Sequence, residues 1–237
     1  MKVPSVLTWA FAVGGASAET IGQINGNRFL SPYAGKNVTN VTGVVTAKGP
    51  SGIWLRSLEP TRDERVSDGI YVFGSALAKN ASIATGDVLV VDGLVSEYRS
   101  NVDYLPLTEI TSPKLRGVLG RNRTFAPIEL GQQRSPPTRL HSSLDEGDIF
   151  GVPNNQSLIS VVNPILRPRK YGLDFWESLV GEYVTIKSPH AVSRPNQYGD
   201  TWVVGTWATT GANGRSGLTV SPKGNGFPTP TEVKFRI

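Results

Sequence analysis

The feature that most constrains the fold of this chain is a β-rich pattern that occurs twice. The first copy begins at Gly35–Thr39 and reaches Gly52–Leu55, and the second begins at Gly181–Thr185 and reaches Gly199–Trp202. Each copy reads as a glycine bend, a long strand, a turn and a second strand that carries a tryptophan. A small barrel begins in this way when its first strand must curl. The sequence therefore predicts two barrel-like modules in series.

The first copy belongs to a set of five predicted strands. Residues 38–48 are dense in valine and threonine, as a half-buried strand should be, and Gly43 marks a bend. Five strands with a short helix between the third and the fourth follow the order of an OB-fold barrel. We therefore expect an all-β fold that begins with an OB-fold five-stranded barrel at residues 19–112. The remaining elements are expected as strands at 53–57, 69–73, 88–98 and 104–111 and a helical turn at 75–80.

The sequence changes in character after the barrel. Residues 113–170 contain frequent proline and little alternation, which predicts an extended connector with short strands at 124–130 and 157–162. Residues 171–237 carry the second copy of the pattern. We expect them to form a second small β-barrel-like module.

A short helix is expected at residues 174–179, where the second module begins. Asp174 can cap its N-terminus, Glu177 follows three residues later as in a capping box, and Gly181 ends the helix. Its apolar residues are Phe175, Trp176 and Leu179. Trp176 is therefore expected to be a buried anchor between the helix and the second module.

The first eighteen residues, 1–18, read as a secretory signal peptide. Lys2 supplies the positive n-region, Val6–Val13 the apolar core and Ala16–Ala18 the small-residue pattern for cleavage before Glu19. The apolar run is too short to span a bilayer, and no later segment is long enough. We therefore expect a secreted, extracellular chain with no membrane anchor.

The cysteine content is compatible with export, and the glycosylation signals support it. The chain has no cysteine, which excludes disulfides and zinc–thiolate or thiol chemistry. The acceptor pattern for N-glycosylation, Asn-x-Ser/Thr, occurs five times. The candidate glycosylation sites are Asn37, Asn40, Asn80, Asn122 and Asn155. Asn37 and Asn40 lie on or beside one predicted strand, which leaves open whether both are used.

Six stretches of this sequence together resemble a known family. The most specific is Tyr171–Gly181, which contains Asp-Phe-Trp-Glu-Ser-Leu-Val-Gly. The others are Ile21–Gly26, Gly43–Ala47, Ser67–Phe73, Gly86–Val88 and Gly217–Val220. These stretches resemble extracellular nucleases of the endonuclease/exonuclease/phosphatase superfamily, and Tyr171–Gly181 is similar to fungal members. The resemblance implies an OB-like, non-catalytic N-terminal region that precedes a metal-dependent nuclease domain.

The chain departs from this superfamily where the catalytic residues should be. The nuclease domain needs a metal-binding carboxylate, a Gly-Asp-x-Asn motif and a Ser-Asp-His motif, and none of them occurs in this sequence. We therefore expect no catalytic residues, no metal and no cofactor. The expected partner is a nuclease catalytic domain missing from this chain, which is compatible with a short natural protein, a truncated gene product or an excised piece.

Other groupings of reactive side chains have ordinary interpretations. A Ser142, His141 and Asp145 triad is disfavoured because sequence neighbours seldom reach that geometry, and His190 follows a proline in a predicted turn. An acidic loop could supply oxygen ligands to a hard cation, but arginines are interleaved with the acids. Its acidic residues are Glu59, Asp63, Glu64 and Asp68. A solvated, salt-bridged loop is the expected outcome.

The net charge of +5 is concentrated in the connector. Residues 19–113 have a net charge of −2, residues 114–170 of +5 and residues 171–237 of +1. Sequence-independent attraction to phosphates would then come from connector arginines. Aromatic residues on the second and third strands would add stacking on single-stranded bases. The candidate nucleic-acid-binding residues are Arg121, Arg123, Arg134, Arg139, Trp54 and Tyr71.

Two other functions are compatible with the sequence. Exposed tryptophan and tyrosine side chains would also suit a module that binds extracellular polysaccharide, and a scaffold role would require no ligand. The salt dependence of binding distinguishes nucleic-acid binding from polysaccharide binding, because phosphate binding weakens steeply with salt whereas stacking on sugars does not.

Overall fold

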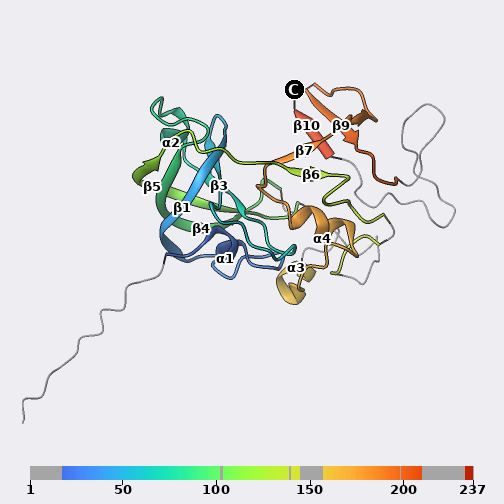
Figure 1. The fold of residues 1–237 in the computed structure, drawn as a ribbon. Helices are drawn as coiled ribbons and strands as arrows, with labels where there is room; N and C mark the ends of the chain where they lie inside the picture. Colours follow the sequence, from blue (N-terminus) through green and yellow to red (C-terminus); the bar gives the residue numbers. More distant parts are fainter. Residues whose placement is uncertain are drawn as a thin grey trace, which may run out of the picture.

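The computed structural model describes residues 18–101, 104–138, 140–144, 157–197, 199–209 and 233–236. Five strands in it close into a barrel in the order β1-β2-β3-β5-β4 (Figure 1). Most of the predicted signal peptide, residues 1–17, lies outside the described residues. The barrel strands are β1 (Asn37–Lys48), β2 (Gly52–Arg56), β3 (Gly69–Phe73), β4 (Val88–Tyr98) and β5 (Leu107–Gly120).

The order and pairing of these strands confirm the predicted OB-fold barrel. Neighbouring strands are antiparallel except β3 and β5, which run parallel, and the short helix α2 (Ser75–Lys79) lies between β3 and β4 in the chain. Another short helix, α1 (Ile21–Asn25), precedes β1; it begins with a capping box between Thr20 and Gln23. The predicted strands agree closely with β1 to β4. β5 is longer than expected and continues past residue 112, where the module was expected to end.

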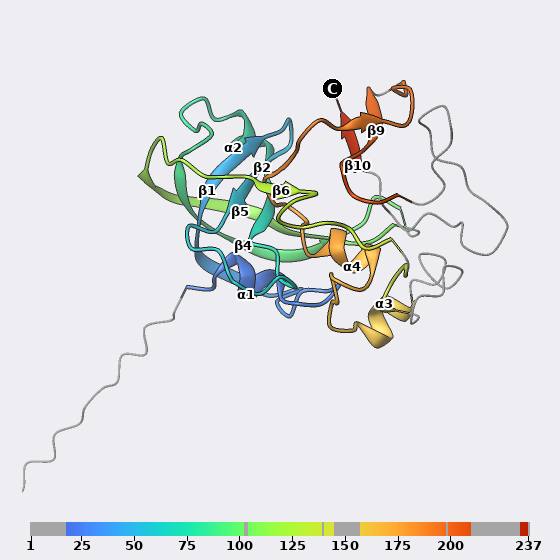
Figure 2. The ribbon, with the colours of Figure 1, turned by 45° about the vertical axis from the view of Figure 1, so that its right-hand side comes forward.

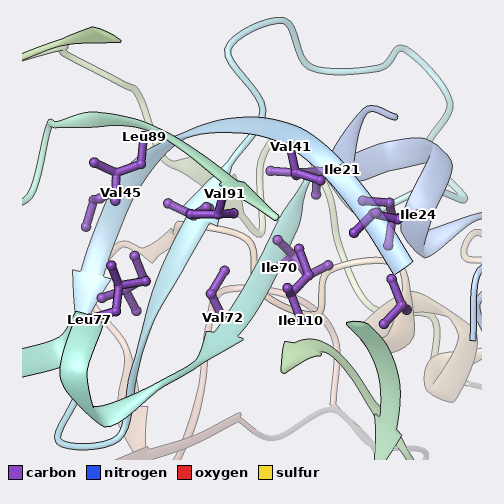
Figure 3. Packing of buried hydrophobic residues seen from close by; sticks show 14 of the residues in the cluster. Ile21, Ile24, Val41, Val45, Ile70, Val72, Leu77, Leu89, Val91 and Ile110 are labelled. Atoms are coloured by element: carbon purple, nitrogen blue, oxygen red, sulfur yellow. The ribbon is translucent and has the colours of Figure 1, made fainter. Parts of the chain in front are cut away.

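The core of the barrel is built from inward-facing aliphatic side chains of all five strands and α1. Ile70 and Val72 of β3 face Val91 of β4 and Ile110 of β5 across the interior (Figure 3). Each of these four residues is at most 1% exposed. Alternation along β3 turns Tyr71 to the outer surface, because successive strand residues point to opposite faces.

Glycines allow the long strands to pass close to their neighbours. A Cβ atom at Gly43 would lie 3.0 Å from the carbonyl oxygen of Arg56, and one at Gly93 would lie 2.4 Å from Cγ2 of Ile110. The register of β1 also shifts twice, between Val38 and Val41 and between Val45 and Ala47. The curl predicted for the first strand therefore comes from bulges together with Gly43.

The rest of the described chain lies beside the barrel and forms two small sheets (Figures 1 and 2). β6 (Ile128–Leu130) pairs in parallel with β7 (Val184–Ile186). β9 (Asp200–Val204) pairs on either side with β8 (His190–Ala191) and β10 (Val233–Arg236). These two sheets do not close into a barrel within the described residues.

The second copy of the sequence pattern is not a structural repeat of the first. β1 and β2 pair with each other, whereas β7 and β9 belong to different sheets. The strand predicted at 157–162 is also wrong, because these residues form the helix α3 (Ser157–Val162). Its Ile159 is 1% exposed and packs with Phe29 and Leu166, so tertiary burial overrides the strand preference of this apolar run.

The helix predicted near Asp174 is present, but it begins earlier. α4 (Gly172–Glu177) has Tyr171 at its N-cap position, without a capping side chain, so the predicted Asp174 cap is wrong. Asp174 is instead fully buried and accepts hydrogen bonds from the backbone N–H groups of Ser143 and Arg167 at 3.0 and 2.8 Å. Its carboxylate thereby fixes two connector segments to the helix.

The barrel is joined to the segment after α4 by a close backbone contact. A Cβ atom at Gly69 would lie 2.0 Å from the carbonyl oxygen of Gly181, whose φ of +79° favours glycine. Beside this contact, Glu182 accepts from Arg56 Nε and from the N–H of Asp68, both at 2.8 Å. The Glu182 carboxylate is 4% exposed, so this ion pair is a buried connection between the barrel and the segment after α4.

Candidate ligand-binding surfaces

Aromatic side chains form a row on the outer face of β2 and β3. The rings of Trp54 and Tyr71 have centroids 4.7 Å apart, and those of Tyr71 and Phe73 are 6.5 Å apart. Trp54 and Tyr71 are half-buried, and Phe73 is 48% exposed. The structure therefore brings together two predicted site residues, Trp54 and Tyr71, and extends the row to Phe73.

This row borders a groove of about 930 Å³ over β3, β5 and β4. Tyr71 and Phe73 form one side, and the half-exposed Tyr98 of β4 lies on the other. The first residues of α2 also reach it. The remaining polar residues that line the groove are Ser75, Ser96, Glu109, Thr111, Ser112 and Lys114.

Glu109 is the acidic residue of this groove. It pairs with Tyr71 of β3 on one side and with Ser96 of β4 on the other. The residue is 4% exposed, and burial raises the pKa of its carboxyl. Burial and, to a smaller extent, the neighbouring Glu109 carboxylate also raise the pKa of Tyr71. Sequence alternation alone did not indicate that an acid lies between the aromatic side chains.

The predicted arginines do not form one cluster. Arg121 pairs with the buried Asp87 at 2.9 Å and donates to the carbonyl of Ser82. Arg134 lies instead against α4, where it donates to Ser178 Oγ at 2.7 Å and its guanidinium lies 5.3 Å from the ring centre of Phe175. Desolvation lowers the pKa of Arg134. These two arginines therefore hold separate parts of the fold together.

Arg123 and Arg139 complete the predicted set. The Arg123 side chain is exposed, and its backbone N–H donates to the carbonyl of Gly86 at 2.8 Å. Arg139 lies outside the described residues. Every described residue of the predicted set remains at least partly accessible, since Arg121 and Arg123 are exposed and Trp54, Tyr71 and Arg134 are half-buried.

The predicted glycosylation sites differ in exposure. Asn37, Asn40 and Asn122 are exposed, and Asn40 and Asn122 have positive φ values of 56° and 57°. Asn80 is half-buried, and its Oδ1 accepts from the N–H and hydroxyl of Ser82. Asn155 lies outside the described residues.

A basic groove lies where the turn after α3 meets the loop after α1. It has a volume of about 500 Å³, and its cationic residues are Arg28, Arg167 and Lys170. The described residues that line it include no carboxylate. Arg167 and Lys170 are exposed, and the Lys170 ammonium lies 4.9 Å from the ring centre of Tyr171. This groove can therefore receive an anion without displacing an internal ion pair.

A second groove of about 550 Å³ continues across Arg167 and Lys170 to the acidic loop. There Arg65 pairs with Asp63 and Arg169 pairs with Glu64, each at 2.6 Å. Hydrogen bonding to these arginines lowers the pKa values of Asp63 and Glu64. The positive surface is thus partly neutralised on this side. Arg167 and Lys170 belong to the basic connector, whereas nothing in the sequence associates them with Arg28.

The acidic loop itself has the salt-bridged structure expected from its arginines. Asp68 accepts from the N–H of Thr61 at 2.7 Å, and burial raises the pKa of its carboxyl. Within the described residues, no group of three histidine, cysteine, aspartate or glutamate side chains could hold a metal ion. Of the triad considered in the sequence, Ser142 is fully buried with its Oγ bonded to the N–H of Leu144, and Asp145 lies outside the described residues.

Comparison with known proteins adds a family match for the second half of the chain. Residues 129–236 match the family described as "Domain of unknown function (DUF8508)". Comparisons with curated proteins and with solved structures give no significant match. The matched region begins at β6 and ends in β10, so it excludes the barrel. Across the part of the chain that the structure describes, no helix has the length and apolar character to cross a membrane.

Proposed function

We propose that this chain is a secreted, non-catalytic module that binds nucleic acid through the groove of Arg28, Arg167 and Lys170. In this proposal it is the accessory region of a nuclease of the endonuclease/exonuclease/phosphatase superfamily. The observation that carries the proposal is the grouping of three cationic side chains around one groove without a carboxylate among its described residues.

The geometry favours phosphate as the bound group. Arginine and lysine side chains around a groove attract the phosphodiester backbone whatever its base sequence. Arg28 comes from the loop before β1, whereas Arg167 and Lys170 come from a turn in the connector, so folding is needed to assemble the groove. The backbone carbonyl of Asn163 accepts from Arg28 Nη1 and orients the guanidinium.

The proposed role is binding, because the sequence lacks the superfamily's Gly-Asp-x-Asn and Ser-Asp-His motifs. Hydrolysis of the bound strand would require a separate catalytic domain. Weak, sequence-independent binding would suffice for such an accessory region, since it raises the local concentration of substrate.

A matched pair of double variants tests this proposal. Arg167→Gln with Lys170→Gln removes two exposed charges from the groove, and Lys36→Gln with Lys79→Gln removes two exposed charges elsewhere. Binding of a labelled single-stranded oligonucleotide is measured by fluorescence anisotropy at low salt. The groove variant should bind several-fold more weakly than the control variant. Equal binding by the two variants would contradict the proposal.

A further inference from the structure

The aromatic groove over β3, β5 and β4 is unsuited to the phosphate ligand proposed for the basic groove. Its side walls present Phe73 and Tyr98, which are 48% and 50% exposed. Half-exposed rings on a folded strand leave flat apolar faces available at little cost in conformational entropy. A ligand with flat apolar faces of its own can therefore stack on them.

Glu109 limits the chemistry of that ligand. The residue is 4% exposed, lies between Tyr71 and Ser96 in the sheet, and lines the groove. A carboxylate that lines the groove can accept hydrogen bonds from a ligand that supplies O–H or N–H groups. A phosphate group would be repelled by the same carboxylate.

Lys114 and the hydroxyl residues narrow the choice between donors. The exposed Lys114 lies along the same groove and disfavours a cationic ligand, whereas Ser96 and Thr111 offer neutral hydrogen-bonding groups. A ligand with many hydroxyl groups, apolar ring faces and no charge fits this combination of lining groups.

We propose that this groove binds a neutral oligosaccharide, with sugar rings stacked on Phe73 and Tyr98 and a sugar hydroxyl donating to the carboxylate of Glu109. A volume of about 930 Å³ lies in the range of sites that enclose a substantial ligand. The site lies on the outer face of the barrel and uses none of the residues of the proposed nucleic-acid groove. Failure of the oligosaccharide proposal would therefore leave the nucleic-acid proposal standing, and failure of the nucleic-acid proposal would leave the oligosaccharide proposal standing.

Calorimetric titration of the full chain with chitohexaose, cellohexaose and laminarihexaose tests the proposal. At least one of them should bind, and Phe73→Ala and Tyr98→Ala should each weaken that binding about tenfold. Glu109→Gln should weaken it by a similar factor, because the amide offers a weaker acceptor than the carboxylate. Trp202→Ala removes a 42% exposed tryptophan outside the groove and should leave binding unchanged.

Several results would overturn the proposal. One is that none of the three sugars binds. Another is that Trp202→Ala weakens sugar binding as much as Phe73→Ala or Tyr98→Ala does. Loss of oligonucleotide or basic-peptide binding in Phe73→Ala, without any sugar binding, would assign the groove to that other ligand. Because Phe73 and Tyr98 are half-exposed, their replacement should preserve the thermal unfolding midpoint. An unchanged midpoint shows that any loss of binding is not due to unfolding.

Discussion

At the scale of single residues, burial separates aromatic side chains that stabilise the fold from those that are free to bind. Phe175 is 2% exposed, whereas Trp202 is 42% exposed. Trp176, expected to be the buried anchor, is only partly buried and meets the rings of Phe175 and Trp207 edge to face. The anchor of α4 is therefore Phe175, with Trp176 packed beside it.

Truncation of Phe175 tests this assignment. Phe175→Ala should lower the free energy of unfolding by about 3–5 kcal/mol, as expected for a large buried side chain. It also removes the ring beneath Arg134. Trp202→Ala should change stability by no more than about 0.5 kcal/mol, because it truncates an exposed side chain. Urea unfolding of the two variants measures both values, and equal losses would contradict the assignment.

Glycine positions allow an equally direct comparison. A Cβ atom at Gly69 would collide with the backbone of Gly181, whereas one at Gly117 on β5 would have nothing within 4 Å. Gly69→Ala should therefore destabilise the chain by about 1–3 kcal/mol, the usual cost of overpacking, or more if the backbone cannot move. Gly117→Ala should be close to neutral. A neutral Gly69→Ala in thermal unfolding would show that the contact between the barrel and the segment after α4 can loosen freely.

At the scale of elements, α4 places a carboxyl where it is hard to ionise. Burial raises the pKa of Glu177 to about 8 from an ordinary value of 4.5, and Glu97 of β4 and Asp174 of α4 add repulsion. Burial likewise raises the pKa of Glu97, which accepts from the N–H of Ser31 and from Thr108 Oγ1. The packing of α4 near Glu97 therefore favours a protonated Glu177.

The sign of the resulting pH dependence follows from linkage. The unfolded chain releases this proton near pH 4.5 and the folded chain near pH 8, so the stabilisation is complete at low pH and is lost as pH rises through about 8. Glu177→Gln should then be more stable than the natural chain near about pH 9 and not near about pH 5. Thermal unfolding at both pH values measures this. A variant that is less stable than the natural chain near pH 9 would contradict the account.

Prediction from sequence worked best where local signals agree with pairing between neighbours. β2 and β3 alternate between buried and more accessible residues, and glycines at 43 and 93 stand where the long strands pass close to their neighbours. The second half depends on pairing between distant segments, as in the parallel contact of β6 and β7. A strand pattern read locally cannot reveal such a partner, and for this reason the second copy was interpreted as a barrel.

The candidate sites were predicted to a smaller extent. Trp54 and Tyr71 lie on the outer face because strand alternation fixes their direction. The structural roles of Arg121 and Arg134 could not be predicted from the sequence, because each depends on an acid or a helix that folding brings beside the arginine. Arg28 joins Arg167 and Lys170 for the same reason, since the backbone of Arg28 pairs with Ile165 in an isolated bridge.

At the scale of the whole molecule, export is a separate prediction. Expression of the gene in a eukaryotic secreting host should yield a protein in the medium whose first residue is Glu19. Its mass should fall after treatment with a glycosidase that removes N-linked glycans, and the exposed Asn37, Asn40 and Asn122 are the expected carriers. N-terminal sequencing and mass spectrometry provide the measurement. Retention of Met1 in the cell fraction would contradict secretion.

The central claim is that the groove of Arg28, Arg167 and Lys170 holds phosphates, and the salt dependence of binding tests it most directly. A plot of log affinity against log salt for a single-stranded oligonucleotide should have a negative slope. The Arg167→Gln and Lys170→Gln double variant should reduce its magnitude by about 1.4, since each lost phosphate contact on a single strand removes about 0.7. The Lys36→Gln and Lys79→Gln control should keep the slope of the natural chain. Identical slopes for all three proteins, or no binding at low salt, would contradict the claim.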